Sequence, residues 1–145
     1  MKWGHFRRQN VKVLIFTDGG ARGNPGPAAV GFIVIDKEKN LVIKKFSKLI
    51  GVATNNVAEY LAVVEALKYL KSFPAKEIEN VDLYSDSQLV VKQLNGFYKI
   101  KNAKLRSLII EVRRLEQEVG GNVFYHQISR EKNQEADDLV NLSLA

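Results

Sequence analysis

The sequence contains no cysteine and no long uninterrupted run of apolar residues. The absence of cysteine excludes disulfides and thiolate metal sites, which fits a reducing compartment. The apolar runs are short and broken by charge, and the first eight residues lack the hydrophobic segment of a signal peptide, so we expect neither a membrane span nor secretion. Neither G-x-G-x-x-G nor a P-loop occurs, which disfavours a nucleotide-binding α/β domain. We expect a cytoplasmic protein.

Acidic residues are too few to balance the basic ones, since 16 Asp and Glu stand against 22 Lys and Arg, a net charge of +6. This excess favours polyanions such as nucleic acids, and solubility alone explains it equally well. The 145 residues contain no linker, repeat or low-complexity tract, and their number fits one domain. We expect a single domain over residues 11–145, preceded by a short basic arm or disordered segment at residues 1–10.

Apolar periodicity predicts a chain of strands and helices. Runs rich in β-branched residues predict strands at residues 11–16, 28–36, 41–50, 81–85 and 123–128. Helical spacing predicts helices at residues 57–73, 100–119 and 134–144, with a brief helix at residues 89–94. The first three strands are typical of an antiparallel meander, and the last two follow helical crossovers, which favours parallel pairing. The predicted fold class is α/β, with helices on the faces of one sheet.

One segment carries more turn-forming residues than a turn requires. In TDGGARGNPGPAA, residues 17–29, Asp18 follows an apolar strand and is itself followed by four glycines and two prolines within nine residues. One or two such residues are enough for a turn. A carboxylate that continues a buried strand needs a cation or hydrogen-bond donors to offset its desolvation. Asp18 is therefore a candidate functional residue.

Three further acids are expected near the same edge of the sheet. Asp86 follows the fourth strand, Glu59 lies in the first turn of a long helix, and Asp137 lies near the start of the last helix. Strand ends and helix starts converge in an open α/β sheet, so a shared divalent ion would serve all four acids.

Each of these three acids also has a structural alternative. Glu59 stands three residues after Asn56, which is the spacing of a capping box. Asp86 could cap the brief helix, and Asp137 could interact with a helix dipole.

Four ordered blocks of the sequence resemble type 1 ribonuclease H. They are DGGARGNPGP from residue 18, TNNVAE from residue 54, YSDSQ from residue 84 and REKNQEAD from residue 130. The resemblance implies the ribonuclease H-like fold, a five-stranded mixed sheet flanked by helices, with strands 1–3 antiparallel and strands 1, 4 and 5 parallel. It also implies an endonuclease that hydrolyses the RNA strand of RNA–DNA hybrids with two Mg²⁺ ions, or Mn²⁺, and leaves 5′-phosphate and 3′-hydroxyl ends. The implied catalytic and metal-binding acids are Asp18, Glu59, Asp86 and Asp137.

The resemblance further implies which residues contact the hybrid. They are Gly19, Asn24, Thr54, Asn55, Asn56, Gln88 and Arg130. Amide side chains both donate and accept hydrogen bonds, which suits 2′-hydroxyls and base edges. We interpret the glycines and prolines after Asp18 as allowing the backbone to approach the nucleic acid closely. The same amides could also serve as turn and cap residues.

The loop before the fourth acid departs from the family pattern because it contains no histidine. Many members have one there that assists proton transfer or product release. Here the loop reads SREKN from residue 129, and His126 belongs to the preceding strand, where a histidine is more commonly a packing or surface residue. We hypothesise that Arg130 takes part of the missing role by holding a phosphate.

Two alternatives to a ribonuclease H stay open at the level of sequence. The chain could be another metal-dependent nuclease of the same fold, or a nucleic-acid-binding module without catalysis. The set of amides favours a hybrid substrate. The intact acids disfavour a binding module, because clustered negative charge repels phosphates unless a metal intervenes. We expect no membrane association and no obligate protein partner, and therefore a monomer.

Overall fold

The computed structural model describes residues 10–73, 77–97, 99–120 and 122–145. Apart from Asn10, the predicted basic arm lies outside the described residues. None of the helices in the described ranges is long and apolar enough to cross a membrane.

Strands and helices alternate along the described chain in the predicted order. The elements are β1 (Val11–Ala21), β2 (Gly26–Asp36), β3 (Leu41–Ala53), α1 (Asn55–Lys71), β4 (Ile78–Ser85), α2 (Gln88–Leu94), α3 (Ala103–Val119), β5 (Val123–Gln127), the 3₁₀ helix η3 (Arg130–Asn133) and α4 (Gln134–Leu144).

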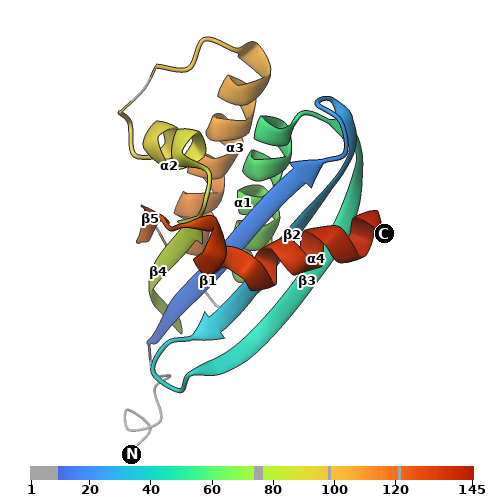
Figure 1. The fold of residues 1–145 in the computed structure, drawn as a ribbon. Coiled ribbons are helices and arrows are strands. Elements are labelled where there is room, and N and C mark those ends of the chain that lie inside the picture. The colour runs from blue at the N-terminus through green and yellow to red at the C-terminus, as the bar shows by residue number, and fades with distance from the viewer. Residues whose placement is uncertain (1–9, 74–76, 98, 121) are drawn as a thin grey trace, which may run out of the picture.

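The strands form one five-stranded mixed sheet in the order β3-β2-β1-β4-β5. β1 pairs antiparallel with β2, and β2 with β3, whereas β1 pairs parallel with β4, and β4 with β5. This confirms the predicted ribonuclease H-like sheet. Helices α1 and α3 cover one face, and α4 crosses the other face over β1, β2 and β3 (Figure 1). The sheet is therefore the middle of three layers.

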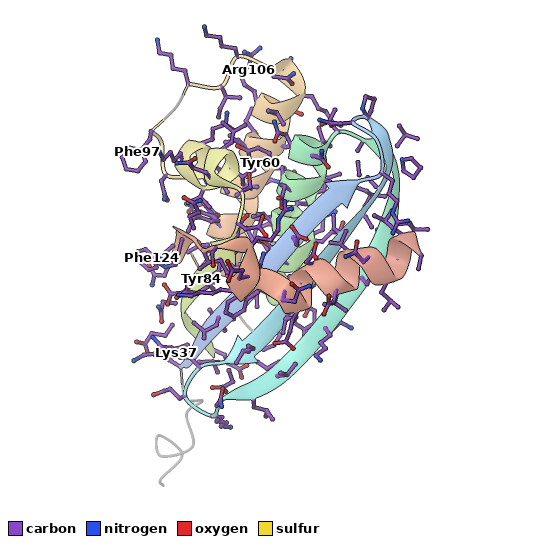
Figure 2. The ribbon with its side chains drawn as sticks, viewed as in Figure 1. Lys37, Tyr60, Tyr84, Phe97, Arg106 and Phe124 are labelled. Atoms are coloured by element: carbon purple, nitrogen blue, oxygen red, sulfur yellow. The ribbon has the colours of Figure 1, made fainter. Side chains whose placement is uncertain are left out.

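The hydrophobic core lies between the sheet and the α1–α3 layer. Val13, Ile15 and Phe32 from the sheet are buried together with Leu67 from α1. Tyr60 on α1 is also fully buried, and its hydroxyl donates a hydrogen bond to the Gln93 side chain of α2. In Figure 2, Tyr60 lies among the helices, whereas Phe97 and Phe124 point outward.

Only α4 has both of its predicted bounds, and two of the differences elsewhere have a clear physical reason. β1 continues to Ala21 instead of ending at residue 16, because its antiparallel register with β2 runs on through Asp18↔Gly31 to Ala21↔Ala28. Helix α3 begins at Ala103 instead of residue 100, because the Asn102 side chain caps it by accepting a hydrogen bond from the backbone of the third helical residue at 3.1 Å. The extended β1 carries Asp18 as a strand residue.

Candidate active site

Two acids reach one edge of the sheet on parallel neighbouring strands. Phe16 of β1 lies opposite Tyr84 of β4, and Asp18 and Asp86 each come two residues later. Parallel strands with equal offsets bring such residues side by side. Asp18 is 6% exposed, so its carboxylate lies almost entirely out of solvent.

Helix α1 brings the third acid onto β1. The N-cap of α1 is Thr54, whose hydroxyl accepts a hydrogen bond from the Val57 N–H at 3.2 Å. Glu59 therefore lies beyond the first turn, and the predicted capping box with Asn56 is wrong. Instead, the Glu59 carboxylate accepts a hydrogen bond from the Gly19 N–H at 3.0 Å. Glu59 thus joins the helix to the strand next to Asp18.

Two glycines of the 17–29 segment serve packing within the protein. A Cβ at Gly19 would lie 2.2 Å from the Ala58 carbonyl oxygen of α1, and a Cβ at Gly26 would lie 1.9 Å from the Arg22 carbonyl oxygen. No side chain fits at such distances. The interpretation that these glycines allow nucleic acid to approach is therefore not needed to explain them.

The cluster of carboxylates consists of Asp18, Glu59 and Asp86, each of which offers an oxygen within 4.8 Å of the others. Asp137 of α4 lines the same hollow as Asp18 but falls outside this compact set. Asp18, Glu59 and Asp137 line a surface hollow of about 380 Å³, together with Arg130. The structure thus brings three of the predicted acids into one cluster and places the fourth at the rim of that cluster.

Burial and mutual repulsion make the cluster costly to ionise without a cation. Burial and the charges of Asp86 and Asp137 raise the pKa of Asp18 to about 8. Burial and the charges of Asp18 and Asp86 raise the pKa of Glu59 well above its ordinary value, and Arg130 offsets part of this rise. A cation would remove this repulsion. An all-oxygen donor set of this kind suits a hard divalent ion such as Mg²⁺.

Three of the predicted substrate-binding residues have structural roles: two join the end of β1 and its loop to α1, and one caps that helix. The Asn24 side chain accepts a hydrogen bond from the Asn55 N–H at 2.9 Å. The Asn55 side chain accepts one from the Ala21 N–H, also at 2.9 Å. Thr54 caps α1. These residues therefore have the structural roles that the sequence left open for them.

Asn56, Gln88 and Arg130 are exposed. Within the part of the chain that the structure describes, the side chains of Asn56 and Gln88 have no hydrogen-bond partner. Their amides are free to donate and accept with a ligand. Asn56 belongs to α1 and Gln88 to α2, the helices that follow β3 and β4.

His126 packs on the sheet, as predicted for a strand histidine. Its Nε2 lies 2.7 Å from Asp82 Oδ1, and its ring lies 4.9 Å from that of Tyr84. It does not line the hollow beside the acids.

Sequence reasoning missed Asn133, which is 1% exposed and donates a hydrogen bond to Asp86 Oδ2 at 3.2 Å. No local pattern distinguishes it from the charged residues around it in the loop. Its burial depends on contacts with β1 and β4, which are distant in sequence.

Comparisons with known proteins identify the family. A family model described as "Reverse transcriptase-like" matches residues 16–143. The crystal structure of LC11-RNase H1, isolated from compost, in complex with an RNA/DNA hybrid superposes with a TM-score of 0.85 at 42% identity, covering 90% of this chain and 95% of that one. The chain belongs to the type 1 ribonuclease H family. Ribonuclease HI of Halobacterium salinarum is a further ribonuclease H relative, 38% identical over 92% of this chain and 64% of that protein.

Ribonuclease H relatives also occur as parts of longer proteins. A bifunctional protein of Mycobacterium tuberculosis is 37% identical over 90% of this chain, which spans only 35% of that protein's length.

Proposed function

We propose that the protein is a metal-dependent endonuclease that hydrolyses the RNA strand of RNA–DNA hybrids, giving 5′-phosphate and 3′-hydroxyl ends. The observation that carries the proposal is the compact set of Asp18, Glu59 and Asp86 oxygens within 4.8 Å of one another, in a chain of the ribonuclease H family. Its likeness to LC11-RNase H1, which binds an RNA/DNA hybrid, supports the choice of substrate.

The residues present fit divalent cations. Asp18, Glu59 and Asp86 would hold one Mg²⁺ or Mn²⁺, and Asp137 at the rim would help hold a second when substrate is bound. When bound, such ions activate water and neutralise charge on the attacking and leaving oxygens. The hydrogen bond from Gly19 holds Glu59 in place.

The hybrid would be recognised by side chains next to the acids. Asn56 and Gln88 present unpaired amides, and 2′-hydroxyls both donate and accept hydrogen bonds. Asn24 and Asn55 keep unused donors, because among the residues that the structure describes only their side-chain oxygens are engaged. Thr54 is proposed to hold a phosphate of the DNA strand, and Gly19 to contribute main-chain contact.

A cleavage assay tests this function and separates it from the alternatives. End-labelled RNA–DNA hybrid, single-stranded RNA, duplex RNA and duplex DNA are incubated with Mg²⁺, Mn²⁺ or chelator. We expect metal-dependent cuts in the RNA strand of the hybrid and none with chelator. Binding of hybrid without cleavage under any metal would support a binding module. Cleavage of DNA strands would support another nuclease of this fold.

Arg130→Ala is expected to reduce hybrid cleavage about tenfold in kcat, because a charge-assisted contact to a phosphate would be lost. Arg130 lies in the hollow with Asp18 and Glu59. Lys132→Ala is the matched control, since Lys132 is an exposed cation of the same 3₁₀ helix and does not line that hollow. Steady-state kinetics measure both variants. An unchanged kcat in Arg130→Ala would exclude the role assigned to Arg130.

A further inference from the structure

Asn133 is held in one orientation by two acceptors, one on β1 and one in the bend after β4. It is the last residue of η3, directly before α4, and its side chain is buried. Its Nδ2 donates to the Thr17 carbonyl oxygen at 2.8 Å and to Asp86 Oδ2 at 3.2 Å. Turning the amide over would set its oxygen against both acceptors. The amide nitrogen must therefore face β1 and Asp86.

This orientation leaves the Asn133 Oδ1 atom buried and, among the described residues, without a hydrogen-bond partner. A buried acceptor without a partner carries a desolvation cost that an apolar side chain of similar size would avoid. Packing alone would therefore favour an apolar residue at this position. The hydrogen bonds of the amide nitrogen are the remaining physical reason for an asparagine here.

The Asp86 carboxylate depends on Asn133 for its orientation. Asp86 lies in the bend after β4, and the neighbouring serines hydrogen-bond the backbone instead of Asp86. Across the described ranges, Asn133 makes the one hydrogen bond that the Asp86 side chain receives. Repulsion from Asp18 and Glu59 would otherwise turn this carboxylate away from them.

Asn133 also links the fourth acid to the other three. Asp137 lies one helical turn after Asn133. The hydrogen bonds of Asn133 fix the start of α4 and therefore the position of Asp137. The hydrogen bond to the Thr17 carbonyl oxygen connects the start of α4 to β1, the strand that carries Asp18.

We propose that Asn133 is a positioning residue that holds Asp86 in the orientation required for cation binding and ties the start of α4 to β1. This inference rests on the proposed metal-dependent function. Mg²⁺ binding to the protein alone, without nucleic acid, measures the effect of Asn133 on the cation site.

The chain provides a matched control in Asn80. Its Nδ2 donates to Asp82 Oδ2 at 3.3 Å, and its Oδ1 is likewise buried without a partner in the described residues. Asp82 lies outside the carboxylate cluster and is paired with His126. Asn80 thus shares with Asn133 the hydrogen bond to an aspartate and the unpartnered oxygen, although among the described residues it donates to a single acceptor and is less deeply buried.

Calorimetric titration with Mg²⁺ alone compares the parent with Asn133→Ala, Asn133→Ser and Asn80→Ala. We expect both Asn133 variants to bind Mg²⁺ about 10- to 100-fold more weakly and Asn80→Ala to bind it as the parent does. On hybrid, Asn133→Ala should lower kcat by a similar factor, leave KM within about twofold, and recover activity as the Mg²⁺ concentration rises.

Parental Mg²⁺ affinity in folded Asn133→Ala would overturn the inference, and a lowered melting temperature in that variant would then show a purely structural role. If Asn133→Ala does not fold, the same reading applies to Asn133→Ser, whose single O–H cannot replace both N–H groups that Asn133 donates to Thr17 and Asp86. A parent that binds Mg²⁺ without cleaving hybrid would contradict the proposed function alone.

Discussion

Asp18→Asn is expected to abolish hybrid cleavage, by about a thousandfold or more in kcat, and at the same time to stabilise the cation-free protein at pH 8. The loss of activity follows because the amide cannot supply the negatively charged oxygen that a divalent ion requires, and Asp18 is the most buried member of the cluster. Asp86→Asn should lose activity to a similar extent. Cleavage at the parental rate by either variant would overturn the assignment of the site.

The gain in stability follows from the raised pKa of Asp18, which is about 8 in the folded protein. An unfolded aspartate has a pKa of about 3.9, so between about pH 4 and pH 8 the unfolded chain binds fewer protons than the folded one. The free energy of unfolding of the parent must then fall as the pH rises through this window. The Asp18→Asn side chain has no proton to lose, so the free energy of unfolding of this variant should change less with pH.

The expected gain at pH 8 lies between about 2 kcal/mol and about 5 kcal/mol, because the full rise in pKa corresponds to about 6 kcal/mol and the carboxyl is only half ionised at pH 8. Urea denaturation in chelator at pH 5 and pH 8 measures it. Asp82→Asn is the control, because Asp82 is on β4, the strand that leads to Asp86, but lies outside the cluster. Adding Mg²⁺ should stabilise the parent more than Asp18→Asn. Equal pH dependence in the parent and Asp18→Asn would show that the cluster does not carry this repulsion.

Gly19→Ala is expected to destabilise the protein by about 3 kcal/mol or more and to lose most of the activity. The new Cβ would lie 2.2 Å from the Ala58 carbonyl oxygen, 2.3 Å from its carbon and 2.7 Å from the Glu59 nitrogen. These are backbone atoms of α1, so no side-chain rotation can relieve the clash and the helix must move. Movement of α1 would break the Gly19–Glu59 hydrogen bond and displace Glu59 from the cluster.

Gly20→Ala is the matched control for this prediction. Gly20 is the next residue of β1, and a Cβ there meets only the Val140 side chain, at 3.7 Å, which is ordinary contact. The free energy of unfolding of Gly20→Ala should stay within about 1 kcal/mol of that of the parent. Alanine also lowers the conformational entropy of the unfolded chain, which offsets part of any loss. Denaturation curves and hybrid cleavage compare the two variants. Similar losses in both would contradict a specific contact between Gly19 and α1.

Much of the fold could be predicted because strand and helix formation depends on neighbours in sequence. The periodicity of apolar residues placed α4 at residues 134–144, which matches Gln134–Leu144. The end of β1 could not be placed in this way, since turn-forming glycines follow Asp18 and their strand conformation depends on pairing with β2. The four acids were predicted as a set, and the structure separates three that share one cluster from Asp137 at its rim.

The sequence by itself determined the alternation of strands and helices, the excess of positive charge and the acids available to hold a cation, because these follow from residue type and local spacing. Only the tertiary structure decided that Glu59 bonds to Gly19 instead of capping its helix, and that Asn133 is buried against Asp86. The physical reason is distance along the chain. Asn133 and Thr17 are 116 residues apart, and a contact between such residues exists only once the sheet and its helices have assembled.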